Sequence, residues 1–183
     1  MKTWTKRSLI SATVIVLLVG AGFAYRQYSY PYGWSHCCDK GLGMQLREYA
    51  DRHGGWFPRG EESPEASLSL LYRMDPNLAY WLRGKTIPES VVHTRLESGK
   101  LLTPETCGWH YVEGLRSDDD PELAILWDKA GLGHNGARLS DGGHWVVFTS
   151  GSREYIPGAD WDRFITQQTQ LQAAIKRKSP ISD

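Results

Sequence analysis

The stretch SLISATVIVLLVGAGFAY, residues 8–25, carries no charged side chain and decides which solvent the rest of the chain meets. As a helix rising about 1.5 Å per residue it would measure about 27 Å, close to the ~30 Å hydrocarbon core of a bilayer. Lys2, Lys6 and Arg7 precede it and Arg26 follows it, so the positive-inside rule places the amino terminus in the cytoplasm. The sequence therefore predicts a single-pass inner-membrane anchor over residues 1–26 and a periplasmic or extracellular domain over residues 27–183.

A cleavable signal peptide fits the same residues. The start is basic, an apolar run follows, and the small residues Gly22 and Ala24 could form a cleavage site before Tyr25. Both alternatives stay open, and both export residues 27–183.

Residues 27–183 have the length of a single domain. All 21 acidic residues lie there, whereas four basic residues lie before it, so the zero formal charge of the chain conceals a net acidic domain. The basic run Lys176, Arg177 and Lys178 is typical of a helix end. We therefore expect the membrane as a partner and no nucleic acid.

The pattern of capping residues and apolar periodicity predicts an α+β fold. Short helices are expected at residues 37–53, 64–74, 76–83 and 88–98, with Leu42, Leu46 and Tyr49 on one face of the first. From residue 101 the pattern favours strands at 109–112 and 123–127 and a hairpin over 137–148 that turns at Asp141, Gly142 and Gly143. A helix from about residue 160 to residue 178 closes the chain.

Three stretches, in this order, resemble type IV pilin-like and type II secretion pseudopilin-like proteins of planctomycete bacteria. They are CCDKGLGMQLREYADRHGGWFP (37–58), SPEASLSLLYRMDP (63–76) with CGWHYVEGLRSDDDPELAILWDKAG (107–131), and GHNGARLSDGGHWVVF (133–148). The group carries a His, nine residues and then Asp-Gly near its carboxyl end. The resemblance implies a pilin-like fold: a long membrane helix and short helices, then a small antiparallel sheet and a carboxyl-terminal helix.

Two features depart from that group. Six residues, not nine, separate His134 from Asp141-Gly142. The apolar helix also lacks the pilin cleavage site and the Glu that follows it in pilins, because no acidic residue precedes Arg26. The charge that would pair with a neighbouring pilin subunit is therefore missing.

The cysteines and several polar clusters are candidates for functional sites. Cys107 is the expected disulfide partner of Cys38, with unpaired thiols as the alternative, because vicinal Cys37 and Cys38 would form a strained ring. His134, Asp141 and His144 are weak metal-ligand candidates, although turn chemistry explains Asp141 equally well. Asp118, Asp119 and Asp120 could hold calcium or simply cap a turn.

No catalytic motif and no cofactor motif is present, so the sequence predicts a non-enzymatic structural or interaction protein of the envelope or of a secretion system. One alternative is a membrane-tethered binding module for envelope glycans that uses exposed aromatic rings. Those rings are Trp56, Phe57, Trp81, Trp109, Trp127, Trp145 and Trp161. A metal-dependent hydrolase is the third reading.

Overall fold

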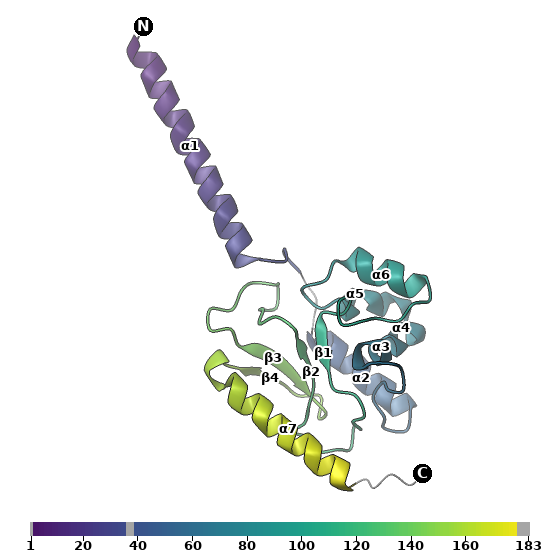
Figure 1. Cartoon of the computed structure of the whole chain (residues 1–183). Coiled ribbons are helices and arrows are strands. Elements are labelled where there is room, and N and C mark those ends of the chain that lie inside the picture. The colour runs from purple at the N-terminus through teal and green to yellow at the C-terminus, as the bar shows by residue number, and fades with distance from the viewer. Residues whose placement is uncertain (1, 36–38, 179–183) are drawn as a thin grey trace.

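The computed structural model describes the backbone of residues 2–35 and 39–178, and the side chains of residues 11–35 and 39–175. Within these ranges the chain forms one long helix that projects from an α+β body (Figure 1). The body has three layers: a group of short helices, a four-stranded antiparallel sheet, and a single long helix on the other face of the sheet.

The projecting helix is α1 (Lys2–Ser29). Within the part of the chain that the structure describes, no helix is both long enough and apolar enough to cross a membrane. This finding contradicts the predicted membrane helix of the pilin-like fold, and with it the single-pass inner-membrane localisation.

The helical layer contains α2 (Asp39–Arg52), α3 (Pro64–Leu68), α4 (Leu70–Met74), the 3-10 turn η1 (Pro76–Leu78), α5 (Ala79–Leu82) and α6 (Glu89–Glu97). The predicted caps are confirmed. The Ser63 hydroxyl accepts a hydrogen bond from the Ala66 N–H at 3.1 Å, and Asp75 accepts one from Asn77 at 2.9 Å. Leu42, Leu46 and Tyr49 of α2 are buried, as their spacing predicts.

The sheet contains β1 (Trp109–Tyr111), β2 (Ala124–Asp128), β3 (His144–Phe148) and β4 (Arg153–Ile156), in that spatial order. Side chains alternate between its two faces. Trp109 and Val147 belong to the core shared with the helical layer, whereas Val146 and Phe148 face the long helix α7 (Trp161–Lys178). The 3-10 turn η2 (Gly158–Asp160) joins β4 to α7.

The predicted hairpin over residues 137–148 is wrong in its pairing. Strand β3 pairs instead with β4 through the turn at residues 149–152, where Gly151 has φ +82°. The expected first arm makes only an isolated bridge between Leu132 and Arg138. Asp141 explains the difference, because its carboxylate accepts hydrogen bonds from the Tyr155 hydroxyl and from the N–H groups of Gly143 and Gly158. These bonds hold the turn against the end of β4.

Candidate functional site

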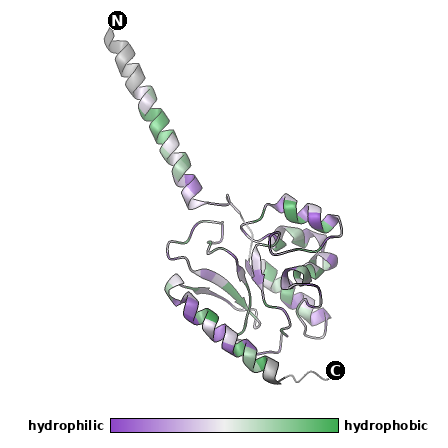
Figure 2. Ribbon diagram, in the orientation of Figure 1, coloured by the Kyte–Doolittle hydropathy of each residue, from purple (hydrophilic) through white to green (hydrophobic). Residues whose placement is uncertain are grey.

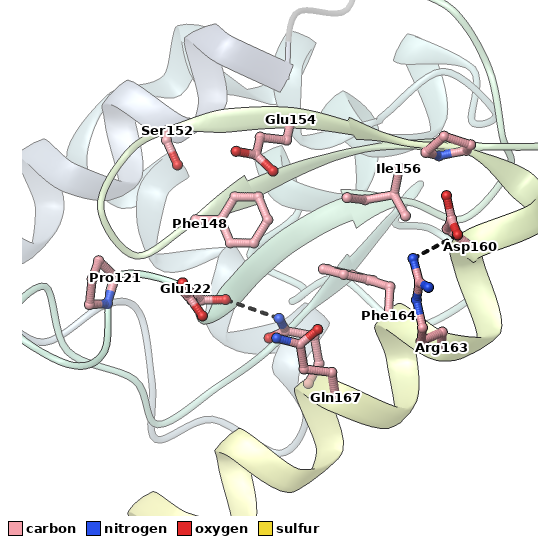
Figure 3. A pocket seen from close by; sticks show the side chains of 12 residues that line it. Pro121, Glu122, Phe148, Ser152, Glu154, Ile156, Asp160, Arg163, Phe164 and Gln167 are labelled. Atoms are coloured by element: carbon pink, nitrogen blue, oxygen red, sulfur yellow. Dashed lines mark hydrogen bonds and ion pairs between the residues drawn. The ribbon is translucent and has the colours of Figure 1, made fainter.

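A pocket of about 380 Å³ lies between β4 and α7 on the outer face of the sheet (Figure 3). Strand alternation places Glu154 and Ile156 of β4 on this face, and Ser152 of the preceding turn lies beside them. The first turns of α7 supply the opposite wall, where Arg163, Phe164 and Gln167 follow one another at helical spacing. The complete lining is Pro121, Glu122, Phe148, Ser152, Glu154, Ile156, Pro157, Asp160, Arg163, Phe164, Gln167 and Gln168.

The pocket combines an apolar floor with a mainly acidic rim. Phe148 and Phe164 stack edge to face with their ring centroids 6.1 Å apart. Of the rim charges, Asp160 pairs with Arg163 at 2.8 Å. Among the described side chains, the carboxylates of Glu122 and Glu154 form no ion pair. Such a lining suits a ligand that has both an apolar part and a positive charge.

Gln168 fixes the floor of this pocket. Its side chain is buried, accepts a hydrogen bond from the Ala124 N–H at 2.8 Å and donates one to the Glu122 carbonyl at 3.0 Å. The oxygen and the nitrogen of the side-chain amide therefore both join α7 to the start of β2, and they hold the wall and the floor of the pocket together.

A second polar cluster lies on the inner side of the sheet, and three of its four side chains are fully buried. Lys85 Nζ donates a hydrogen bond to Asp128 Oδ2 and lies 3.8 Å from Asp39 Oδ2. The side chains of Lys85, Asp39 and Asp128 are at most 1% exposed. A guanidinium nitrogen of Arg153 lies 3.0 Å from Asp39 Oδ2, as an ion pair that lacks the alignment of a hydrogen bond.

Each member of this cluster comes from the end of an element. Asp39 is the first residue of α2, Asp128 is the last of β2 and Arg153 is the first of β4. Lys85 follows α5, and Gly84 beside it has φ +63°. A Cβ on Gly108 would lie 2.3 Å from the Arg83 carbonyl oxygen, so glycine is what allows this turn to approach β1.

Burial dominates the electrostatics of the cluster. Desolvation raises the pKa of Asp128 to about 6, against the lowering effect of Lys85. Asp128 Oδ1 is buried and has no hydrogen-bond partner. The sequence pattern does not predict this cluster; its one local signal is Asp128, which ends an otherwise apolar strand.

The predicted metal candidates do not come together. His134 is exposed, Asp141 is bound within its turn, and His144 Nδ1 lies 3.1 Å from the Asp128 carbonyl oxygen. The imidazole of His144 also stacks on Trp161 with centroids 4.1 Å apart. Over the described residues, no group of three His, Cys, Asp or Glu side chains is placed to hold a metal ion.

We predict that His144 makes a pH-dependent contribution to the free energy of unfolding. Burial lowers its pKa below the ordinary 6.5, so the unfolded state takes up a proton first as the pH falls through that value. The contribution of His144 should therefore be lost as the pH falls below 6.5. Urea titrations at about pH 7.5 and about pH 5.5 should show a smaller drop in unfolding free energy for His144→Gln than for the unchanged chain. Equal drops would contradict this role.

The remaining polar candidates have local partners. Asp118 pairs with Arg116 at 2.7 Å, Asp119 accepts from the Arg116 N–H, and Asp120 accepts from the Glu122 N–H, so the run caps its own turn. Cys107 is buried, and desolvation raises the pKa of its thiol to about 12. Cys38 lies outside the described residues, so the Cys38–Cys107 bridge stays a prediction.

Most of the aromatic residues named for glycan binding lie in or against the core: Phe57 and Trp109 are part of it, and Trp81, Trp127 and Trp161 pack against it. Trp109 and Phe57 are buried, and the other five are half-buried. Trp56 is covered by Arg59, whose guanidinium carbon lies 3.4 Å from the ring centroid. Trp145 is covered in the same way by Arg153, whose guanidinium carbon lies 3.7 Å from the ring centroid.

Comparison with protein-family models found no match, and neither did comparison with curated proteins or with solved structures. Any assignment of function to the body of the protein therefore rests on the pocket between β4 and α7 and on the buried cluster around Lys85.

Proposed function

We propose that this chain is a non-enzymatic, pilin-like structural and interaction protein, in which α1 packs among helices of other pilin-like subunits and the α+β body is carried at its end. The observation that supports the proposal is the apolar surface of α1 (Figure 2). Its exposed large side chains are Val14, Ile15, Val16, Leu17, Leu18, Val19, Phe23, Tyr25 and Tyr28.

The distribution of these side chains favours several neighbouring helices over one. The apolar run from Val14 to Val19 covers more than one helical turn, so no side of this part of α1 is polar. An amphipathic helix would need only one partner surface, whereas a helix that is apolar all round is normally buried on every side. An exposed patch of this kind marks an interaction site.

The charge of α1 favours partners that differ from this chain. Lys6, Arg7 and Arg26 lie on the helix, and no acidic residue accompanies them. Copies of this chain packed together would bring like charges close, which opposes association. We therefore infer that the partner helices carry the Glu that pilins have and that this helix lacks.

The body gives no support to an enzymatic alternative. The candidate residues for metal-dependent hydrolysis are separated, and His144 and Asp141 have structural partners. The amine and the carboxylates of the cluster around Lys85 are closed to a substrate, because the side chains of Lys85, Asp39 and Asp128 are at most 1% exposed.

The proposal is tested by co-expressing the full chain with full-length pilin-like subunits whose amino-terminal helices carry Glu. The unchanged chain should co-purify with such a subunit, and Leu17→Glu should weaken the complex by at least about tenfold, because it places a charge inside the bundle. Val91→Glu, on an exposed position of α6, is the matched control and should leave binding unchanged.

Two results would overturn the proposal. One is a chain that stays monomeric with all of these subunits or inserts into lipid vesicles as a monomer. The other is an equal loss of binding in Leu17→Glu and Val91→Glu, which would show that α1 is not the contact.

A further inference from the structure

The buried cluster of Lys85, Asp128, Asp39 and Arg153 is not used by the proposed function. It places a primary amine in direct contact with a carboxyl group, with a second carboxylate 3.8 Å from the amine. The Trp109 ring centroid lies 5.8 Å from Nζ, and the surrounding side chains belong to the hydrophobic core. Water is therefore excluded from the place where the two groups meet.

As separate ions, Lys85, Asp128 and Asp39 would leave three charges in the interior, beside the partly exposed Arg153. Buried ion pairs recover their desolvation cost only when the remaining lone pairs are also satisfied. Here Asp128 Oδ1 has no hydrogen-bond partner, and Asp39 Oδ2 is not aligned with the Arg153 guanidinium. Removing one positive and one negative charge together would leave Asp39 and Arg153 as one balanced pair.

We propose that Lys85 and Asp128 are joined by an amide bond that forms within the folded protein, with Asp39 as the proton relay. The Nζ lone pair attacks Cγ of Asp128, an N–C bond forms, and one C–O bond of the carboxyl group breaks. Of the three protons on the Lys85 ammonium, one stays on the amide nitrogen and two leave with the oxygen as water. No oxidant, reductant or further reactant is needed.

Asp39 has the position that this relay requires. Its Oδ1 accepts a hydrogen bond from the Lys40 N–H at 2.8 Å, which fixes the carboxylate, and its Oδ2 points to both Lys85 and Arg153. It takes one proton from the ammonium, which frees the lone pair, and passes it to the Asp128 carboxylate, which gives the uncharged acid. After the attack a second proton passes from the nitrogen to the leaving hydroxyl, which departs as water.

The environment favours the forward reaction. Burial raises the pKa of Asp128 and so favours the uncharged acid, whose carbon is the better electrophile. Contact between the two groups replaces a collision in solution by a fixed geometry. Because the site is dry, the product water leaves and hydrolysis is suppressed.

The bond would connect two layers of the protein. Lys85 follows α5 in the helical layer and Asp128 ends β2 in the sheet, so the amide closes a loop over residues 85–128. Such a cross-link persists in denaturant, unlike an ion pair.

The test is the mass of the purified full chain under denaturing, reducing conditions. The unchanged chain should be about 18 Da lighter than its sequence, the mass of one water. Trypsin should then release residues 84–95 linked to residues 117–129, with no cleavage after Lys85. A chain at its full sequence mass, cleaved at Lys85, would overturn the proposal, and so would a mass deficit that maps elsewhere.

Variants separate the roles. Lys85→Arg keeps the charge without an acylable amine and should have its full mass, and Asp39→Asn should lose the deficit because the relay is gone. Asp128→Asn can lose only ammonia, about 17 Da. Lys129→Arg is the matched control: Lys129 pairs with Glu65 at 3.0 Å, but in a partly exposed site, so this variant should keep the deficit. A retained deficit in Lys85→Arg would contradict the proposal.

Discussion

Replacing Lys85 by methionine is expected to lower the free energy of unfolding by about 3–5 kcal/mol. The reason is the burial of its partners: Asp128 and Asp39 are 1% exposed, and without Lys85 only Arg153 remains to balance two carboxylates. The loss should be measured by urea denaturation of the full chain at neutral pH, with the slope of the transition compared as well.

A second variant distinguishes buried charge from lost packing. In Lys85→Met with Asp128→Leu, the uncompensated carboxylate is gone, so a substantial part of the lost stability should return. The matched control Lys129→Met removes a partly exposed ion pair and should cost less than about 1 kcal/mol. If Lys85→Met and Lys129→Met cost the same, the buried cluster would not have the importance assigned to it.

The second large effect is expected at Trp109, where substitution by alanine should cost about 3–5 kcal/mol. Trp109 is fully buried where β1 meets the helical layer, and its indole N–H donates to the Trp81 carbonyl oxygen at 2.7 Å. Truncation would leave a cavity and would remove the shorter of two hydrogen bonds to the Trp81 carbonyl oxygen, which also accepts one from the Gly84 N–H at 3.3 Å.

Two further variants divide that cost. Trp109→Phe keeps most of the ring but loses the hydrogen bond, so it should cost about 1–3 kcal/mol. Trp34→Ala, at an exposed position, should cost less than about 1 kcal/mol. Denaturant titrations measure all three, and a Trp109→Ala loss no larger than that of Trp34→Ala would contradict the expected role in the core.

Elements with local signals were predictable from the sequence. Helix starts are predictable at Ser63-Pro64 and at Asp75-Pro76, because each capping side chain and the N–H group that it accepts from lie within three residues of each other in the sequence. The spacing of Leu42, Leu46 and Tyr49 likewise predicts the buried face of α2, because residues three and four positions apart lie on one side of a helix. The carboxyl-terminal helix was likewise expected from about residue 160, and α7 begins at Trp161.

Elements that depend on distant contacts were not predictable. Strand β4 has four residues with no apolar alternation, and it exists because β3 and the Asp141 turn hold it in place. The pocket depends on where α7 crosses the sheet. The prediction that residues 8–25 span a membrane is wrong, because no helix among the described residues is long and apolar enough to do so. The exposed apolar side chains of α1 remain the basis of the proposed function.

The sequence by itself determined the α+β order of this chain, its helix caps and an apolar helix without carboxylates, because each depends on residues a few positions apart. Only the tertiary structure decided that Lys85 meets Asp128, 43 residues away, and that Asp39 and Arg153 complete the cluster. Charged residues normally remain in water, so their burial follows from the packing of the sheet against the helices and not from any local pattern.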